Sequence, residues 1–292
     1  MVLNIRIFLL LMIWPNMFAF GQTDGKVISK TKESIPYANI IEVNRSFGVA
    51  ADMHGRFELQ QPKSILDTCF LKISALGYRD TIIHASSLYQ DCVVILTKAS
   101  LLLQEVSITS GKGNSYCLGV DRKCIVLCGG WPGVYPGQQY GLFIKSSIDG
   151  IKVNSIEVYI KKEGSPTSPF RIRIYAFDSI TELPGNDILT KQYIGRAKKG
   201  NEWVSINIKN ENIFIPKQGI VVAVEWIFTN DKYYYSNDDA GHNYYGVVIG
   251  QGNKSKLPSV YRKKFETGWV KVSFPQSIKK FPRPAIRLNC SD

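Results

Sequence analysis

The sequence predicts an all-β protein built from two β-sandwiches. Apolar and polar residues alternate with a period of two in many short segments, and turn residues separate these segments at roughly ten-residue spacing. No window of helical period competes with this pattern in the second half of the chain. Aromatic residues, which favour strands, make up 12% of the 292 residues. This length suits two domains of ordinary size.

Residues 1–21 are expected to form a cleavable export signal. Arg6 is the only charge before Asp24, and residues 7–14 form an apolar core. This core is much shorter than the roughly 20 residues that a membrane-spanning helix needs, although an uncleaved anchor is the alternative. No cysteine lies near the cut, so a lipoprotein is not indicated. We expect the mature chain to be exported without a transmembrane segment, and to be periplasmic, outer-membrane associated or secreted.

Residues 22–108 form the first predicted domain. Its strands are expected near residues 26–28, 36–43, 67–75, 81–83 and 93–96, with a further strand starting at residue 56. Asp52 and Gly55 have the spacing of the first and last residues of a type I turn. Alternation over residues 67–75 places Cys69, Leu71 and Ile73 on one face, the pattern of a half-buried strand.

Five motifs in this domain occur in order. They are Gly25-Lys26-Val27, Pro36-Tyr37-Ala38-Asn39-Ile40, Gly48 with Asp52-x-x-Gly55-x-Phe57, Ser74-Ala75-Leu76-Gly77-Tyr78, and Leu103-Gln104-Glu105-Val106. Together they resemble the carboxypeptidase-regulatory-like domain that is abundant in exported proteins of Bacteroidetes bacteria. The resemblance implies a non-catalytic, transthyretin-like β-sandwich of about seven strands. Val49 and Ala51 replace the usual Thr residues without affecting the expected fold.

A polar, glycine-rich stretch separates the two domains. We expect a linker at residues 109–116 and a larger, jelly-roll-like β-sandwich of nine or ten strands at residues 117–292. Residues 220–228 are apolar on both faces except for Glu225, which predicts a central strand covered on each side. Residues 169–175 and 183–187 are similar to the jelly-roll partner that often follows the regulatory-like domain.

The formal charge of +12 favours acidic partners. For an exported chain these are acidic glycans or lipopolysaccharide, and not nucleic acid. A solvated basic face without a specific partner is the alternative. The basic residues cluster late in the chain, at Lys254, Lys256, Arg262, Lys263, Lys264, Lys279, Lys280, Arg283 and Arg287.

Six cysteines follow the predicted signal. Cys69 and Cys290 alternate with apolar residues, so each is expected to be a small buried side chain. Cys117, Cys124 and Cys128 lack the paired spacing of a zinc site. The alternative to free cysteines is a disulfide, either between two of these three cysteines or from one of them to Cys290.

Motifs for catalysis and for metal or cofactor binding are not found. None of His54, His84 and His242 has a glutamate three residues later, as a zinc carboxypeptidase requires. The chain has no Gly-x-Ser-x-Gly motif, and the glycine spacing at residues 250–255 does not suit a phosphate-binding loop. We therefore expect no enzymatic activity, no metal and no cofactor.

A glycan hydrolase with paired carboxylates is the alternative. Glu225 is its strongest candidate, because burial on an apolar strand raises the pKa of a carboxyl group and a proton donor needs a raised pKa. An ion-paired, structural Glu225 is the competing interpretation. The other candidates are Asp178, Asp187, Asp238 and Asp239.

The strongest candidate for ligand binding is the loop at residues 233–245. Tyrosine faces stack on sugar rings, and neighbouring Asn and Asp side chains bind hydroxyl groups or calcium. A plain hairpin with tyrosine-bearing strands is the competing interpretation. The aromatic loop at residues 131–136 would line the same site or cap the sandwich edge. The candidate ligand-binding residues are Tyr233, Tyr235, Asp238, Asp239, His242, Tyr244 and Trp131.

These features favour a non-catalytic, exported module of the cell envelope that binds a glycan or an envelope protein. A further alternative is an accessory protein of a TonB-dependent outer-membrane uptake system. The regulatory-like domain often precedes TonB-dependent receptor barrels, but this chain is too short to contain one.

Overall fold

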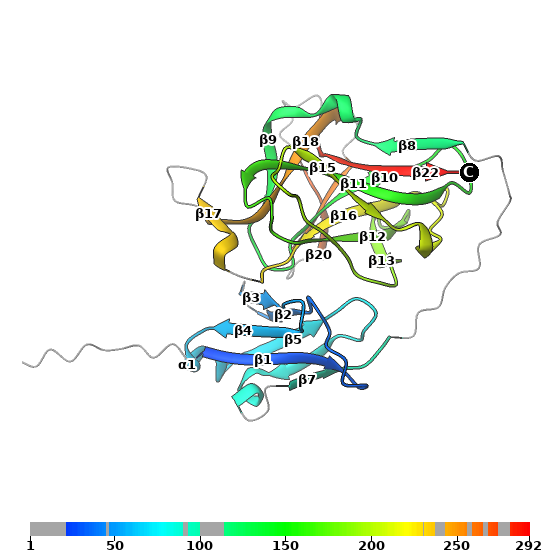
Figure 1. Cartoon of the computed structure of the whole chain (residues 1–292). Coiled ribbons are helices and arrows are strands. Elements are labelled where there is room, and N and C mark those ends of the chain that lie inside the picture. The colour runs from blue at the N-terminus through cyan, green and yellow to red at the C-terminus, as the bar shows by residue number, and fades with distance from the viewer. Residues whose placement is uncertain are drawn as a thin grey trace, which may run out of the picture.

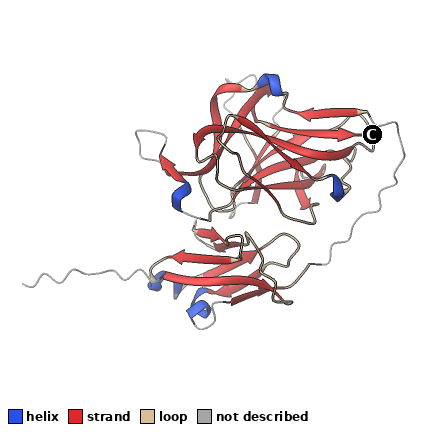
Figure 2. Cartoon of the chain, in the orientation of Figure 1, coloured by secondary structure: helices blue, strands red, loops and turns tan. Residues whose placement is uncertain are grey.

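A computed structural model describes residues 22–44, 47–89, 93–99, 114–229, 231–236, 243–255, 259–264, 268–273 and 281–292. The described chain is almost entirely β and forms two bodies, each with its own hydrophobic core (Figures 1 and 2). The predicted all-β fold is confirmed. The predicted export signal and residues 109–113 of the predicted linker lie outside the described residues.

The first domain is a sandwich of a three-stranded and a four-stranded sheet, with strand orders β4-β1-β7 and β3-β2-β5-β6. Strand β1 pairs antiparallel with β4 and parallel with β7. The elements are β1 (Gln22–Ser29), β2 (Asn39–Glu42), β3 (Gly48–Ala50), β4 (Arg56–Gln60), α1 (Lys63–Leu66), β5 (Phe70–Ser74), β6 (Thr81–His84), η1 (Ala85–Tyr89) and β7 (Val93–Leu96).

The core of the first domain follows the predicted alternation. Cys69, Leu71 and Ile73 are buried between the sheets, whereas Phe70 on the opposite face is exposed. The predicted turn is also confirmed, because the Gly55 N–H donates to the Asp52 carbonyl over 3.1 Å. Gly55 has a φ of +75°, a conformation that glycine adopts without steric cost.

The second domain contains two larger sheets. The first has the order β13-β12-β16-β10-β19-β20, with β14 also paired to β12. The second has the order β17-β18-β11-β22-β8, with β15 on β11 and with β9 and β21 on β18. The elements are β8 (Ser115–Gly119), η2 (Arg122–Cys124), β9 (Val126–Gly133), β10 (Gln139–Ile144), β11 (Lys152–Gly164), β12 (Phe170–Asp178), β13 (Leu183–Asp187), β14 (Tyr193–Gly195), β15 (Glu202–Asn207), η3 (Lys209–Glu211), β16 (Ile220–Trp226), η4 (Asp231–Tyr233), β17 (Tyr234–Ser236), β18 (Asn243–Ser255), β19 (Val260–Lys264), β20 (Gly268–Lys271), β21 (Phe281–Pro284) and β22 (Ile286–Ser291).

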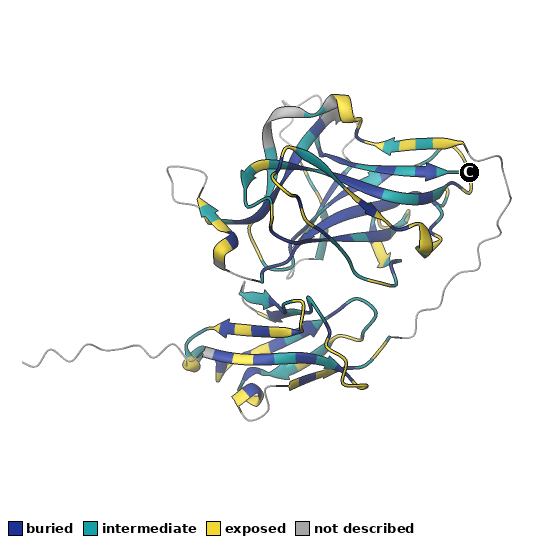
Figure 3. Cartoon of the chain, in the orientation of Figure 1, coloured by how far each residue is buried: buried dark blue, intermediate teal, exposed yellow. Residues whose placement is uncertain are grey.

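Strand β16 is central, as predicted. It lies between β12 and β10, and every residue from Ile220 to Trp226 is buried (Figure 3). Its inward side chains join a large core between the two sheets, and Val221 and Ala223 join a small aromatic cluster on the outer face. The prediction of a second, larger sandwich is confirmed. The expected number of strands is wrong, because short strands such as β14 and β17 have only three residues and show too little alternation to be recognised.

The two domains meet on one side of the smaller sandwich. Figure 1 shows β2 and β3 of the first domain nearest to the second domain, with β1 and β7 on the far side. The β3–β2 side of the four-stranded sheet therefore faces the second domain.

Candidate functional site

The predicted family motif around residues 36–39 lies against the outer face of the β16 sheet. Asn39 Nδ2 donates to Glu225 Oε1 over 2.7 Å. The Arg171 guanidinium donates to the main-chain carbonyl of Tyr37. Tyr37 has a φ of +54°, in the left-handed region that non-glycine residues seldom adopt. We call this set of four residues, Tyr37, Asn39, Arg171 and Glu225, the docking contact.

Main-chain groups extend the contact on both sides. Gln192 Nε2 donates to the carbonyl of Pro36 over 2.9 Å. The N–H of Ala50 donates to the carbonyl of Phe228 over 2.8 Å, so the chain after β16 occupies part of the edge of β3. Polar side chains and backbone therefore join the domains, with specific partners at each point.

Glu225 is the centre of a buried ionic network. It is fully buried, and its carboxylate accepts from Arg171 Nη1 over 2.9 Å and from Arg173 Nη1 over 3.2 Å. Arg173 also pairs with Asp187 through its Nε. Gln139 Nε2 lies 3.5 Å from the second oxygen of Glu225. Each charge in the network therefore has an oppositely charged partner, as buried charges require.

The network determines the ionisation of Glu225. Burial alone raises the pKa of this carboxyl group, but Arg171 and Arg173 outweigh burial and hold the pKa below its ordinary value. A proton donor needs the opposite shift. The ion-paired interpretation of Glu225 therefore agrees with the structure, and the proton-donor interpretation does not.

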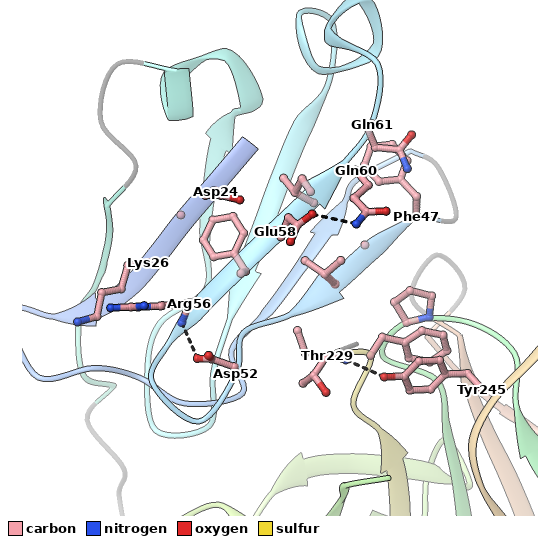
Figure 4. A pocket seen from close by; sticks show the side chains of 18 of the residues that line it. Asp24, Lys26, Phe47, Asp52, Arg56, Glu58, Gln60, Gln61, Thr229 and Tyr245 are labelled. Atoms are coloured by element: carbon pink, nitrogen blue, oxygen red, sulfur yellow. Dashed lines mark hydrogen bonds between the residues drawn. The ribbon is translucent and has the colours of Figure 1, made fainter. Parts of the chain in front are cut away.

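Next to the docking contact is a groove of about 1080 Å³ between the two domains (Figure 4). Its first wall is formed by strands β1, β3 and β4, and its second wall by the loop after β9 and the segments around β17 and β18. The side chains that we use below to define the groove are Asp24, Lys26, Phe47, Asp52, Arg56, Glu58 and Gln60 of the first domain and Val134, Pro136, Phe228, Tyr234 and Tyr245 of the second.

The wall from the first domain is charged. Figure 4 shows Glu58 and Arg56 along β4, with Asp24 and Lys26 on the neighbouring strand. Gln60 Nε2 donates to Glu58 Oε1 over 2.8 Å. The main-chain N–H of Arg56 donates to the carboxylate of Asp52 over 2.9 Å.

The wall from the second domain is aromatic. The rings of Phe228 and Tyr245 are stacked, with centroids 3.8 Å apart and planes at 14°. The Tyr245 hydroxyl accepts from the N–H of Thr229 over 2.8 Å, which fixes the ring in place. Tyr234 packs edge-on against Tyr245, and 48% of its surface is exposed. Phe228 and Tyr245 are 5% and 1% exposed, so Tyr234 supplies the aromatic surface that a ligand can reach, opposite the polar and charged wall.

The predicted tyrosines of the β17–β18 hairpin lie on two different faces. Tyr234 is opposite Tyr245, and Tyr235 is opposite Tyr244, in the antiparallel register. Because side chains alternate across a strand, the first pair faces the groove and the second pair faces away from it. Tyr235 and Tyr244 are half-buried, with ring centroids 5.9 Å apart. Burial raises the pKa of the Tyr235 hydroxyl.

Tyr233 and Trp131 are not among the residues that line the groove. Tyr233 is 8% exposed and packs edge-on against Tyr245, so its ring face is not open to a ligand. Trp131 is half-buried on β9 and packs against Tyr140, with centroids 4.7 Å apart. Residues 134 and 136 of the same loop do line the groove. Three candidates lie outside the described residues: Asp238, Asp239 and His242.

The predicted loop at residues 233–245 includes Tyr234 and Tyr245, but neither was among the individual candidates. Phe228 and the charged wall on β4 were not predicted. The tyrosine register carried a usable signal, because period-two alternation separates Tyr234 from Tyr235. No such sequence pattern distinguishes Glu58 from an ordinary solvent-facing residue of a strand.

Other predicted sites have structural roles. Asp178 caps an exposed turn by accepting from the N–H of Ile180 over 2.8 Å and from the Thr181 hydroxyl over 2.8 Å. His84 Nδ1 lies 2.6 Å from the Ser86 hydroxyl. Within the described residues, no group of three or more His, Cys, Asp or Glu side chains could hold a metal. In the same part of the chain, no helix is long and apolar enough to cross a membrane.

The cysteines agree in part with the predictions. Cys69 and Cys290 are buried, as expected, and Cys290 is a free thiol. Cys117 is also free, so the alternatives of a disulfide from this cysteine to Cys290 and of a disulfide between it and Cys124 or Cys128 are wrong. The side chains of Cys124 and Cys128 lie outside the described residues.

The predicted basic surface is described at four positions. Arg262, Lys263, Arg283 and Arg287 are each partly buried. Arg287 Nε lies 3.1 Å from a carboxylate oxygen of Glu157, and Lys263 lies over an aromatic ring at 5.7 Å from its centroid. Two of these side chains are therefore engaged within the protein instead of forming a solvated face.

Comparisons with known proteins place the first domain. No curated protein matches the chain. A solved structure, the cysteine protease and lectin-like domains of Cwp84, a surface layer associated protein of Clostridium difficile, aligns with 12% identity and a TM-score of 0.35. The alignment covers 94% of this chain and 59% of that chain, and a similarity this low does not define a shared fold.

The family model described as CarboxypepD_reg-like domain matches residues 23–108. The match includes strands β1 to β7 and the motif that forms the docking contact. Residues 23–108 are therefore similar to the CarboxypepD_reg-like domain family.

Proposed function

We propose that this chain is an exported, non-catalytic binding module of the cell envelope whose ligand occupies the groove between the two domains. The observation that carries the proposal is the groove itself, a space of about 1080 Å³ with a charged wall and an aromatic wall. Concave sites that combine apolar surface with a few polar groups are the usual places for ligands.

The hydrogen bonds that join the two walls support this role. The docking contact joins the domains next to the groove, so the walls do not need to be assembled when a ligand arrives. A preformed site avoids the entropic cost of ordering its parts on binding. The ionic network around Glu225 supports a non-catalytic role, because it uses this carboxylate for structure.

The ligand class follows from the two walls. Tyr234 offers an exposed ring for stacking on a sugar or on an apolar side chain, and Glu58 and Arg56 offer polar partners. A glycan or an envelope protein fits both walls. Export and envelope location form part of the proposal and rest on the sequence pattern of residues 1–21.

A glycan panel with groove variants tests the proposal. The purified mature chain would be titrated with neutral and acidic glycans at low and high salt. We expect binding that persists at high salt and is weakened about tenfold or more by Tyr234→Ala, which corresponds to at least about 1.4 kcal/mol. Binding that high salt abolishes would instead indicate non-specific attraction to the basic chain.

Variants on the opposite face of the hairpin provide the matched control. Tyr235→Ala and Tyr244→Ala remove the same kind of ring from the same hairpin, but outside the groove. Retained binding in these variants would support the groove. Loss in these two variants, with retention in Tyr234→Ala, would move the site to the other face of the hairpin.

A further inference from the structure

We infer that the free edge of β4 is a strand-addition site, which takes an extended peptide with alternating basic and apolar side chains. This inference rests on the proposed function, because it names the ligand class for the same groove. It is carried by the main-chain hydrogen bonds of β4, by the charges beside them and by the apolar surface behind them.

The backbone of β4 has an open side. The Val27 N–H donates to the Gly55 carbonyl over 2.8 Å, which makes this a hydrogen-bonded pair of the β1–β4 ladder. Antiparallel ladders alternate, so the next bonded pairs toward the end of β4 involve Phe57 and Leu59. The N–H and C=O groups of Arg56, Glu58 and Gln60 then face away from β1.

Only the first of these outward positions is satisfied. The N–H of Arg56 donates to the Asp52 carboxylate over 2.9 Å, and its carbonyl accepts from the Asp52 N–H over 2.7 Å. The main-chain groups of Glu58 and Gln60 have no such partner in the described part of the chain. An unpaired edge of this kind is a template for another strand.

One of the two strand edges beside the groove already has a partner. The edge of β3, which faces the same space, receives the Phe228 carbonyl at Ala50. The second domain thus shields part of β3 and leaves β4 exposed beside the groove. The open edge at Glu58 and Gln60 is therefore next to a preformed cavity and not on a flat surface.

The charges along β4 select the exposed side chains of the peptide. Glu58 lies directly opposite Asp24 on the same face of the sheet. Arg56 and Lys26 lie two positions along on the same face, but the main-chain groups of Arg56 are occupied by Asp52. An added strand therefore ends before Arg56, and its basic side chain meets Glu58 and Asp24. A lysine or arginine across from Glu58 is therefore favoured over an acidic residue.

The opposite face selects apolar side chains. Alternate residues of an added strand would point the same way as Phe57 and Leu59, toward the mouth of the sandwich. Phe47, Val49 and the aromatic wall of the second domain line the groove there. The peptide therefore needs apolar residues between its basic ones.

A second copy of the same strand fits less well. Antiparallel pairing of two β4 strands about Glu58 would place two glutamates directly opposite each other, which is destabilising. The charge pattern thus disfavours self-pairing in this register.

Capped peptides of seven residues that alternate lysine and valine are the probe. The mature chain would be titrated by calorimetry and by amide hydrogen exchange measured with NMR. We expect a dissociation constant of about 1 mM or lower. At ten times this concentration, exchange at the Glu58 and Gln60 amides should slow about tenfold, because the bound fraction protects them.

Two substitutions at one position separate backbone from side chain. Gln60→Pro removes an outward N–H without removing a bond to β1, a position where an edge strand tolerates proline. Gln60→Ala keeps the N–H. We expect Gln60→Pro to weaken binding about tenfold or more and Gln60→Ala to leave it within about threefold. Glu58→Lys is a second variant, which should reverse the preference toward a glutamate–valine peptide.

Several outcomes would overturn the inference. The first is that the lysine–valine peptide does not bind at several times 1 mM, and the second is that Gln60→Pro binds it as tightly as the unmodified chain does. The other two are that the unmodified chain binds an alternately N-methylated peptide, or the glutamate–valine peptide, as tightly as the lysine–valine peptide. If these occur while Tyr234→Ala still weakens glycan binding, the proposed function stands and this inference fails. If neither glycans nor peptides bind, both fail.

Discussion

The docking contact and the groove lie between the same two domains, and each contains a glutamate, but the surroundings of the two glutamates differ. In the docking contact a glutamate is fully buried, with two arginines and an asparagine around its carboxylate. In the groove another glutamate, Glu58, is exposed and has a glutamine beside it. The contact satisfies the polar groups of both partners, whereas the groove leaves main-chain groups of β4 unpaired. The first region is therefore suited to holding the domains together, and the second to accepting a ligand.

Substitution of the buried glutamate should have the largest effect. Glu225→Gln leaves Arg171 and Arg173 buried without a full countercharge, and the loss of one partner from a buried pair costs about 3–5 kcal/mol. Urea unfolding of the mature chain measures this cost as a lower free energy of unfolding.

Glu58→Gln is the matched control for that measurement. It makes the same chemical change on the exposed wall of the groove, where surface substitutions change stability by about 0.5 kcal/mol or less. Equal effects of the two substitutions would contradict the distinction between a buried, structural carboxylate and an exposed one.

Acid provides a second way to test the same pair. The folded pKa of Glu225 is lowered, so its ionised form stabilises the fold above its unfolded pKa of about 4.3. This contribution is lost as the pH falls through the lowered folded pKa. The stability difference between the unmodified chain and Glu225→Gln should therefore be full at pH 7 and shrink at acidic pH. Urea titrations at several pH values would measure it, and a difference that is constant down to pH 2 would exclude the linkage.

Much of the fold could be predicted from local pattern. The buried positions 69, 71 and 73 follow from alternation, and the turn at Asp52 and Gly55 follows from residue type and spacing. The central position of β16 follows from its two apolar faces. Each of these signals is contained in a few neighbouring residues, which is why the sequence alone reveals them.

The candidate site was harder to predict, because it depends on contacts between distant segments. Asn39 and Glu225 are 186 positions apart, and no local pattern pairs them. The hairpin tyrosines were recognised as a group, but the choice between Tyr234 and Tyr235 depends on which face meets the first domain. The ion-paired role of Glu225 was one of two interpretations, and the guanidinium groups of Arg171 and Arg173 decide between them.

A smaller loss of stability than that of Glu225→Gln is expected for the hydrogen bond between the domains. Asn39→Ala removes a donor to the buried carboxylate while both arginines remain, so it should cost about 1.5–3 kcal/mol, the range for a hydrogen bond to a charged group. If this bond also couples the domains, the first domain should unfold at lower urea in the variant while the second domain is less affected.

Two measurements follow the two domains separately. Fluorescence of the tryptophans reports on the second domain, since Trp131, Trp203, Trp226 and Trp269 lie there. Amide exchange in β2 and β5 reports on the first domain. Asn207→Ala, which removes an amide oxygen that accepts from the Lys209 N–H within the second domain, is the control. Coincident unfolding of both domains in Asn39→Ala, with no loss of stability beyond this control, would mean that the bond from Gln192 to the Pro36 carbonyl and the main-chain bond at Ala50 are sufficient to hold the two domains together.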